Sequence, residues 1–447
     1  MKKILALILP VLLVLAGATA KFVTRTPASP FDGAAAPAAS ADLVARGAYL
    51  ARAGDCVACH SLPGGRAYAG GLKMPTPMGA IYATNITPDK ATGIGTYTLA
   101  DFDRALRHGV AGDGHRLYPA MPYPSYAKLT DEDVRALYAY FLHGVAPVRQ
   151  ANRASDIPWP LNLRWPLSLW NGVFAPSAPF RANPAKDALW NRGAYLVQGA
   201  GHCGACHTAR GLAMNERGTD QSSSAYLSGA VIDHWYAPSL RGDPNTGLAR
   251  WSENDIFRFL KTGRNQHGVV YGSMAEAFNN STQFLTDRDL RAIAHYLKDL
   301  PGDPNRDGAP WQYRPAGDTL SVAKRTGDLG AQVYAAKCSF CHGPDGRGKA
   351  PWIPPLAGTA SSLARHGDSQ INITLNGSAR VVAAGVPDAY RMPAYRAQLS
   401  DAQVAAVVSF VRRNWGNDSG AVTPRAVTAI RRDTRAAVLD ISPLPTR

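Results

Sequence analysis

The chain has 447 residues, too many for one ordinary hydrophobic core, and this length predicts about three domains. Apolar residues make up 46% and charged residues 18% of the chain, a composition that excludes a largely disordered protein. The formal net charge is +15, which suits an acidic protein partner or an anionic membrane surface. Nucleic acid is the weakest candidate partner, because Lys and Arg form no dense run.

Residues 1–20 have the three parts of a secretory signal peptide. Two lysines follow Met1, an apolar run extends from Ile4 to Leu15, and an Ala-X-Ala site ends at Ala20. The alternative is an uncleaved anchor, but the run is shorter than the roughly 20 residues that span a bilayer. We therefore expect cleavage after Ala20 and a mature protein in the bacterial periplasm, at the face of the inner membrane.

A Cys-X-X-Cys-His pentapeptide occurs three times and uses all six cysteines. The copies are Cys56, Cys59 and His60; Cys203, Cys206 and His207; and Cys338, Cys341 and His342. This is the attachment signature of c-type haem, in which both thiols bond to the haem and the adjacent imidazole binds the iron. The alternatives are weaker: a zinc site usually needs two pairs close in sequence, and a redox dithiol does not require the histidine. The sequence predicts three covalently bound haem c groups.

Each motif follows a short helical pattern that also recurs. Arg46–Leu50 reads Arg-Gly-Ala-Tyr-Leu and is repeated residue for residue at 192–196, with a looser version at 330–334. An identical pentapeptide at nearly the same offset from the cysteines indicates an internal repeat rather than ordinary helix packing.

Each repeat ends in a second predicted helix. Thr130, Thr286 and Ser400 are placed to cap these helices, with an acid or amide three residues later and apolar residues at helical spacing. The same position in the three helices holds an aromatic residue: Tyr140, Tyr296 and Phe410. We expect a mostly α-helical fold of three tandem cytochrome c-like domains, each wrapped around one covalent haem c, in which the closing helix crosses the opening helix.

The repeats divide the chain into domains and linkers. The expected ranges are 1–20 for the signal peptide, 42–146, 187–301 and 327–416 for the first, second and third repeats, 147–186 and 302–326 for the linkers, and 417–447 for a tail. The first linker contains Pro158–Trp170, which is too apolar for a solvated spacer; packing on the protein body is favoured over docking of a partner. The second linker has the composition of a plain connector. The tail has two interpretations: it binds a membrane surface, or it is disordered or packs across the domains.

Loops between the two helices of each repeat also correspond. Residues 83–94 are echoed at 237–248, and Pro354–Leu356 holds the analogous place in the third repeat. One hypothesis is that each loop supplies the backbone carbonyl that orients the proximal imidazole. The alternative is a well-ordered turn without that role.

One methionine in each repeat lies in a predicted loop just before the closing helix: Met121, Met274 and Met392. A lone methionine is more often core filler, but three at matched positions predict the second axial ligands of the three irons. The candidates without a matched position are Met74, Met78, Met214, His108, His115 and His267. Six-coordinate iron favours electron transfer over peroxide or oxygen chemistry.

Several stretches together resemble one protein family. They are Gly47–Leu50, Cys56–His60, Gly70–Leu72, Thr84–Asp89, Tyr118–Tyr123, Ala136–Phe141, Pro158–Trp170 and Gly201–Thr208. These stretches resemble the tri-haem cytochrome c subunits of bacterial membrane-bound dehydrogenases that act on gluconate, alcohol, fructose and related compounds. The resemblance covers most of Ala41–Gly416.

The resemblance implies an electron-transfer subunit. Such a subunit takes electrons from a flavin- or quinone-cofactor dehydrogenase catalytic subunit, passes them through three haems to ubiquinone, and helps to hold the complex at the membrane surface. The chain has no dinucleotide fingerprint, so we expect no substrate-oxidising site of its own. The alternatives are a free periplasmic multihaem electron carrier and, less favoured, a haem peroxidase-type enzyme with an open iron position.

Overall fold

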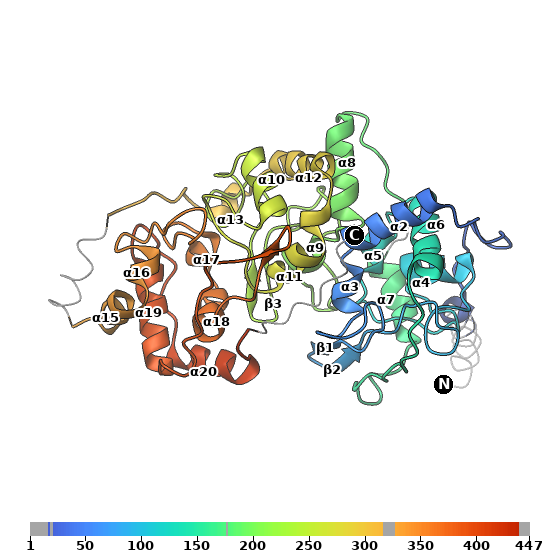
Figure 1. The fold of residues 1–447 in the computed structure, drawn as a ribbon, viewed down its shortest axis with the longest axis horizontal. Coiled ribbons are helices and arrows are strands. Elements are labelled where there is room, and N and C mark those ends of the chain that lie inside the picture. Colours follow the sequence, from blue (N-terminus) through green and yellow to red (C-terminus); the bar gives the residue numbers. More distant parts are fainter. Residues whose placement is uncertain (1–16, 18–20, 176–177, 316–326, 438–447) are drawn as a thin grey trace, which may run out of the picture. The chain divides into compact units, whose positions relative to one another are not determined.

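The computed structural model describes residues 17, 21–175, 178–315 and 327–437, so the predicted signal peptide lies outside the described residues except for Gly17. The chain divides into two compact units (Figure 1). Unit 1 comprises Met1–Ala51, Cys59–Leu62 and Arg66–Arg181, and unit 2 comprises Arg52–Ala58, Pro63–Gly65 and Ala182–Arg447. Unit 2 therefore contains both the second and the third Cys-X-X-Cys-His motif. The predicted fold class is confirmed, because helices dominate and the strands form only small hairpins.

The first repeat and the linker after it form nine elements. They are α2 (Ala41–Ala53), α3 (Cys56–Cys59), β1 (Lys73–Thr76), β2 (Gly79–Tyr82), α4 (Leu99–His108), α5 (Tyr123–Tyr126), α6 (Asp131–Ala139), the π-helical turn η1 (Tyr140–Gly144) and α7 (Pro166–Phe174). Strands β1 and β2 pair antiparallel, with Lys73 opposite Tyr82.

The elements of the second and third repeats all lie in unit 2. In the second these are α8 (Ala188–Gln198), α9 (Gly204–His207), β3 (Ala230–Ile232), β4 (Trp235–Ala237), α10 (Glu253–Thr262), α11 (Ser273–Asn280), the 3₁₀ turn η2 (Thr282–Phe284) and α12 (Asp287–Asp299), followed by α13 (Pro304–Asp307). In the third they are α15 (Leu329–Lys337), α16 (Ser339–His342), α17 (Ala360–Leu363), α18 (Asp368–Asn376), β5 (Val382–Ala383), β6 (Val386–Pro387), α19 (Asp401–Arg413) and α20 (Pro424–Asp433). Strands β3 and β4 pair antiparallel, as do β5 and β6.

The opening helix of each repeat crosses the closing helix at a glycine. A methyl group on Gly193 of α8 would overlap the carbonyl oxygen of Ala292 in α12 and stand 2.7 Å from the Cβ of Tyr296. The same arrangement joins Gly47 to Ala136 and Tyr140, and Gly330 to Ala406 and Phe410. The predicted helix crossing is therefore present three times. Because the two helices are in backbone contact at this point in every repeat, the opening helix has a glycine there.

The predicted helix caps are confirmed. The side chains of Thr130, Thr286 and Ser400 each accept a hydrogen bond from the backbone N–H three residues later. In the first two repeats the acid at that third position also binds the arginine of the opening helix. Arg46 lies 2.7 Å from Asp133, and Arg192 lies 2.7 Å from Asp289.

The third repeat lacks this arginine and closes its cap in another way. The side chain of Gln403 accepts a hydrogen bond from the backbone N–H of Ser400, which completes a reciprocal capping box. The opening helix α15 begins at Leu329, in the place that the arginines occupy in the other repeats. The same helix crossing is thus stabilised by an ion pair in two repeats and by a capping box in the third.

A middle helix in each repeat occupies the region where the sequence analysis placed only loops. These helices are α4, α10 and α18. Thr98 with Asp101 and Ser252 with Asp255 form reciprocal capping boxes at the starts of α4 and α10, and left-handed Gly109 and Gly263 end these two helices. The signals for two of the three middle helices were therefore present in the sequence as Thr-X-X-Asp and Ser-X-X-Asp.

The described part of the tail packs on the protein body. Val427 and Ile430 of α20 are buried in the core of the third repeat, and Arg431 lies 2.7 Å from Asp401 at the start of α19. Asn376 of α18 donates to Thr434 at the end of α20. The tail thus packs through α20 on the third repeat itself, and residues 438–447 lie outside the described residues.

The first linker departs from the expectation that it packs on the body. Ile157 is buried, but Trp159 is 77% exposed, Leu161 52% and Val173 70% exposed. The expectation was wrong for most of the apolar side chains of this segment, because α7 rests on unit 1 by one side only.

No helix among the described residues has the length and apolar character needed to cross a membrane.

Candidate haem sites

Each Cys-X-X-Cys-His motif folds into a single short helical turn. These turns, α3, α9 and α16, leave the first cysteine half-buried and the second exposed in all three copies. Burial raises the pKa of Cys203 and that of Cys338, the first cysteines of their motifs, to about 12. A redox-active dithiol is normally found where the thiol pKa is lowered, so this environment does not suit the redox alternative.

The histidine of each motif contacts one backbone carbonyl through Nδ1. The distances are 2.7 Å from His60 to Thr84, 2.7 Å from His207 to Pro238, and 3.0 Å from His342 to Pro354. The hypothesis that these loops supply a carbonyl to the imidazole is therefore confirmed in all three repeats. With its proton on Nδ1 donated to the carbonyl, the ring keeps its lone pair on Nε2.

The three imidazoles are also held in the neutral state. Burial lowers the pKa of His60, His207 and His342, and the hydrogen bond to the carbonyl opposes this only in part. A neutral imidazole is the form that binds a metal ion. The geometry of each motif thus fits a proximal haem ligand.

The carbonyl loops of the first two repeats are built alike. Asp89 accepts hydrogen bonds from the backbone and hydroxyl of Thr92, and Asp243 accepts the corresponding bonds from Thr246. The next residue is glycine in both loops, and in the second a methyl group on Gly247 would stand 2.5 Å from the carbonyl oxygen of Arg241. The turn is therefore tight enough to exclude a side chain at this point.

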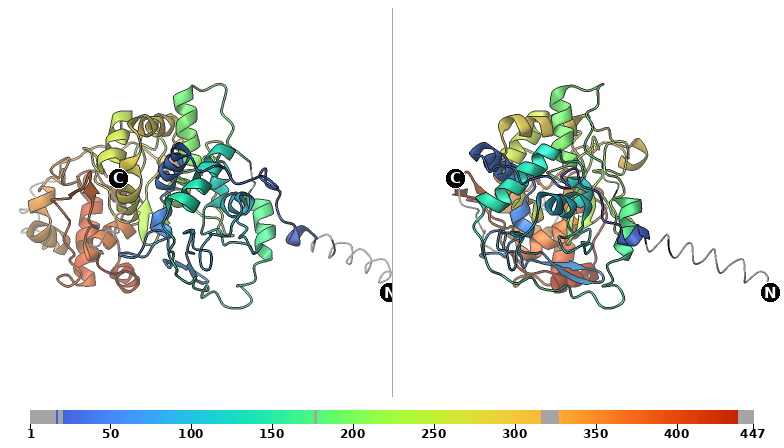
Figure 2. Two further views of the ribbon diagram at one scale, coloured as in Figure 1. Left: turned by 45° about the vertical axis from the view of Figure 1, so that its right-hand side comes forward. Right: turned by 90° about the vertical axis from the view of Figure 1, so that its right-hand side faces the viewer.

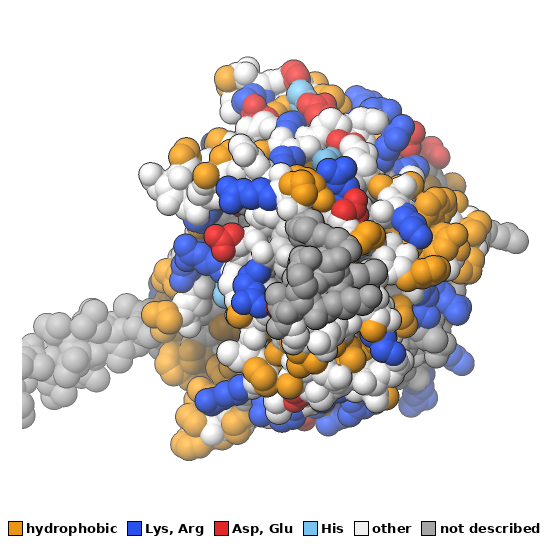
Figure 3. All heavy atoms as spheres, turned by 90° about the vertical axis from the view of Figure 1, so that its left-hand side faces the viewer, with side chains coloured by type: hydrophobic (Ala, Val, Ile, Leu, Met, Phe, Trp, Pro, Cys, Tyr) orange, Lys and Arg blue, Asp and Glu red, His pale blue; other side chains and the backbone are white. Residues whose placement is uncertain are grey.

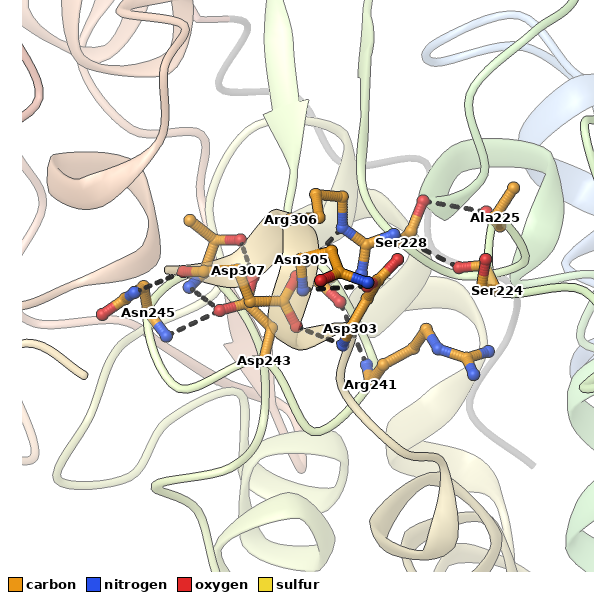
Figure 4. A network of polar contacts seen from close by, with 12 residues as sticks. Ser224, Ala225, Ser228, Arg241, Asp243, Asn245, Asp303, Asn305, Arg306 and Asp307 are labelled. Atoms are coloured by element: carbon orange, nitrogen blue, oxygen red, sulfur yellow. Dashed lines mark hydrogen bonds and ion pairs between the residues drawn. The ribbon is translucent and has the colours of Figure 1, made fainter. Parts of the chain in front are cut away.

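A polar network joins the second carbonyl loop to the start of the second linker (Figure 4). Arg241 donates to the carbonyl oxygens of Pro301 and Tyr226 at 2.9 and 3.1 Å. Asn245 donates to the carbonyl of Asp307 at 2.7 Å and accepts from the backbone N–H of Trp311 at 2.8 Å. The first part of this linker is thus bound to the second repeat, and the plain-connector interpretation was wrong for residues 303–311.

The third carbonyl loop is anchored by Asn417. Its amide donates to the carbonyl of Leu356 at 3.1 Å and accepts from the backbone N–H of Gly358 at 2.8 Å. The same amide donates to the carbonyl of Val411 near the end of α19. The three repeats therefore reach one imidazole–carbonyl geometry with different supporting side chains.

The three matched methionines are all half-buried. Met121 precedes α5, and Met392 lies in the loop between β6 and α19. Met274 is the second residue of α11 rather than a loop residue, because Gly272 takes a positive φ of 58° and starts the helix just before it. Met78 and Met214, which have no matched position, are 42% and 43% exposed.

Two of the three histidine alternatives have other partners. Nδ1 of His115 lies 2.5 Å from Asp113 in the neighbouring turn. His267 stacks on Trp251 with ring centroids 5.1 Å apart and lies 3.5 Å from Asp255. His108 is half-buried at the end of α4, where burial lowers its pKa. Met74, another candidate axial ligand, lies in strand β1 opposite Ile81 of β2.

The methionine segments of the second and third repeats are bound to each other. Asn279 of α11 donates to the carbonyl of Arg380 at 2.9 Å and accepts from the backbone N–H of Val382 at 2.9 Å. Gln283 donates to the carbonyl of Val382 at 2.9 Å and accepts from the N–H of Ala384 at 3.0 Å. Two amide side chains thus bind the backbone of the β5–β6 hairpin as a neighbouring strand would.

Apolar contacts support the same junction. Val381 is buried in one cluster with Val270, Ala275 and Phe278 of the second repeat, and Met274 packs against this cluster. The segment that leads to Met392 is therefore held by the helix that carries Met274. The contact between the β5–β6 hairpin and the second repeat could not be predicted from the sequence, because residues 380–384 contain no local pattern that indicates which distant segment they contact.

Other features of the motifs also fit a bound haem. The hydroxyl of Tyr226 is buried and has no hydrogen-bond partner among the described residues, and its ring lies 3.1 Å from the position of a Cβ at Gly204, inside the second motif. A buried hydroxyl without a partner is costly unless a bound group satisfies it. Within the described ranges, no group of three or more His, Cys, Asp and Glu side chains is arranged to hold a metal ion.

Known proteins resemble this chain over most of its length. A cytochrome c family model matches residues 44–144, 191–301 and 327–415. The chain is 49% identical over 407 residues to the cytochrome c subunit of alcohol dehydrogenase (quinone) from Gluconacetobacter polyoxogenes, which covers 90% of this chain and 86% of that protein.

Two further relatives have related names. The gluconate 2-dehydrogenase cytochrome c subunit of Pantoea cypripedii is 50% identical over 405 residues, covering 88% of this chain and 90% of that protein. The fructose dehydrogenase cytochrome subunit of Gluconobacter japonicus is 39% identical over 413 residues, covering 87% and 82%. The chain therefore belongs to the cytochrome c family and, within it, to the cytochrome c subunits of bacterial dehydrogenases, as the resemblance implied.

Proposed function

We propose that this chain is the electron-transfer subunit of a dehydrogenase complex at the periplasmic face of the inner membrane. It would take electrons from a catalytic subunit that oxidises a sugar, an alcohol or gluconate with a flavin or quinone cofactor, and pass them to ubiquinone. The observation that carries this proposal is the threefold occurrence of one Cys-X-X-Cys-His turn with its imidazole bound to a loop carbonyl. The names of the relatives support the dehydrogenase partner.

In this proposal, the cysteines, the histidine and the matched methionine of each repeat have defined roles. The two cysteines of a motif would hold one haem c covalently, and the histidine, through Nε2, and the thioether of the matched methionine would ligate its iron. Each haem, when bound, supplies an iron centre that gains and loses one electron at a time. The carbonyls of Thr84, Pro238 and Pro354 hold the rings in one orientation, so little reorganisation accompanies the change of charge.

The remaining sequence predictions form part of the same proposal. The domain ranges 42–146, 187–301 and 327–416 and the binding of three haem c groups follow from the repeats, and cleavage of residues 1–20 follows from the signal-peptide pattern. We assign no substrate-oxidising site and no nucleic-acid partner to the chain. Figure 3 shows Lys and Arg side chains spread among apolar ones over one visible face, which suits an acidic partner or an anionic surface.

The test is to purify the chain from its native membrane in mild detergent, identify the proteins that co-purify, and assay substrate-dependent reduction of a ubiquinone analogue. We expect a flavin or quinone dehydrogenase in the preparation, and reduction of the haems when its substrate is added. A chain that emerges alone, and whose haems no co-expressed dehydrogenase reduces, would contradict the subunit function and favour a free periplasmic carrier.

The peroxidase-type alternative has a separate measurement. It requires an iron with an open position, which binds cyanide or carbon monoxide rapidly and turns over hydrogen peroxide. Three irons with histidine and methionine ligands would bind these molecules slowly. Rapid binding at one haem of the intact wild-type complex would favour the enzyme.

A further inference from the structure

An apolar surface segment in unit 1 is left largely exposed by the residues that the structure describes. Residues 158–173, here called the apolar strap, include α7 and the turns before it. Their exposed residues are all apolar or glycine except Asn162. The large exposed side chains are Trp159, Leu161, Leu163, Trp165, Leu169 and Val173, between 41% and 77% exposed. Monomeric soluble proteins rarely expose so many large apolar side chains in one short segment.

Helix α7 presents this surface in a fixed orientation. Trp165, Leu169 and Val173 are spaced four residues apart, so they lie along one side of the helix. The other side is bound to unit 1, because buried Ser168 donates to the carbonyl of Val23 at 3.1 Å and Asn171 accepts from the hydroxyl of Tyr123 at 2.6 Å. These contacts fix the orientation of α7, so that Trp165, Leu169 and Val173 face away from unit 1.

The one charged residue within the strap, Arg164, belongs to a cluster of three arginines. The guanidinium of Arg164 lies 3.7 Å from the ring centroid of Tyr118 and donates to the carbonyl of Arg116 at 2.9 Å. Arg116 in turn donates to the carbonyl of Arg25 at 2.6 Å. None of these three arginines has an ion-pair partner within the part of the chain that the structure describes. Three cations without a carboxylate partner among the described residues therefore lie in or next to the strap.

The chain just after the predicted cleavage site extends the same surface. Phe22 is 47% exposed, and its ring lies 3.0 Å from the position of a Cβ at Gly172 in α7. Figure 2 shows residues 21–24 beside the end of α7. Lys21 and Arg25 flank Phe22 and are both exposed, so cations border the apolar side chains here as well.

We propose that the apolar strap is the segment by which this chain binds a lipid bilayer with anionic headgroups. Trp159 and Trp165 suit the boundary between headgroups and acyl chains, Leu169 and Val173 suit the acyl region, and the three arginines complement lipid phosphates. The strap lies in the membrane surface and does not cross it. This inference rests on the proposed function for the presence of the chain at a membrane, and it names the residues that bind there.

The test uses the full-length mature holoprotein and vesicles of phosphatidylethanolamine with phosphatidylglycerol. The variant Leu169→Gln with Val173→Gln replaces two apolar side chains that are 42% and 70% exposed. We expect its vesicle affinity, measured by co-flotation, to fall at least about tenfold, because the apolar area buried in the bilayer is lost. Wild-type binding should also weaken on vesicles of phosphatidylcholine alone, which carry no net charge.

A matched control is Leu212→Gln, which changes a fully exposed leucine in the second repeat and should leave vesicle binding unchanged. Covalent haem content and the visible spectrum of every variant show that it is folded. Vesicle binding that is unchanged in the double variant overturns the proposal. Loss of co-purification with the dehydrogenase, with vesicle binding retained, would also overturn it and assign the strap to a protein partner. If the dehydrogenase fails to reduce the haems while the strap variant still loses vesicle binding, the proposed function fails and the membrane contact stands.

Discussion

Gly193 of α8 lies directly against the backbone carbonyl of Ala292 in α12, and this contact sets the distance between the two helices of the second repeat. Gly47 and Gly330 have the same relationship to Ala136 and Ala406. The closing helix can therefore approach the opening helix only where the opening helix has no Cβ.

The first prediction concerns this contact. We expect Gly193→Ala to destabilise the protein by about 2–3 kcal/mol, because the added methyl group overlaps backbone atoms that cannot move without separating the helices. The measurement is thermal or denaturant unfolding of the holoprotein. Gly268→Ala is the matched control, since only one atom lies within 4.0 Å of a Cβ at that position in the same repeat. Equal effects of the two substitutions would refute the overlap argument.

The second prediction concerns the axial ligands. Met121→Ala, Met274→Ala and Met392→Ala should each change the spectrum of one haem and lower its reduction potential, because a thioether ligand stabilises the reduced iron. Covalent haem content should stay at three, since the cysteines are untouched. Met78→Ala and Met214→Ala serve as controls because both side chains are exposed. If two of the three matched substitutions leave spectrum and potential as in the wild type, the ligand assignment is wrong.

The third prediction concerns the junction between the second and third repeats. Asn279→Ala with Gln283→Ala removes four hydrogen bonds that hold the β5–β6 hairpin. We expect weaker methionine ligation at the third haem, because the loop that carries Met392 begins at this hairpin. The readouts are the sulfur-to-iron charge-transfer band and the potential of that haem.

Two comparisons sharpen this experiment. Gln332→Ala, at an exposed position of α15, should leave both readouts unchanged. Met392→Ala reports whether Met392 is a ligand at all. If Met392→Ala alters the third haem and the double amide variant does not, the hairpin has no positioning role.

The fourth prediction is a pH dependence of stability. His295 of α12 lies 2.9 Å from Glu253 and 3.4 Å from Asp187, and the hydrogen bond to Glu253 raises its pKa, with further contributions from the charges of both acids. The folded protein therefore binds the proton more tightly than the unfolded chain. This contribution is fully present below the ordinary histidine pKa of about 6.5 and is lost as the pH rises through the higher folded value.

Unfolding measured between about pH 6 and pH 8 checks this linkage. The wild type should lose stability across this range more steeply than His295→Gln, which cannot titrate. The burial of His295 acts in the opposite direction, but the two acids outweigh it. Identical slopes for the two proteins would show that the ion pairs of His295 do not contribute in solution.

Much of the site followed from local sequence because its signals are local. The cysteine and histidine spacing reflects covalent and coordinate bonds within five residues, and the caps at Thr130, Thr286 and Ser400 depend on contacts three residues apart. The middle helices α4 and α10 also had local signals, as the capping boxes at Thr98 and Ser252 show. The sequence therefore contained the information needed to predict α4 and α10, although these two helices were not predicted.

The sequence by itself determined the three attachment motifs, the repeat and the helix starts, since these depend on residue type at short spacing. Only the tertiary structure decided which carbonyl meets each imidazole, because every residue has a carbonyl and the path of the loop selects Thr84, Pro238 or Pro354. It also decided that α20 packs inward while the apolar strap stays exposed. Both segments have apolar side chains, and which of them is buried depends on whether a complementary surface lies opposite.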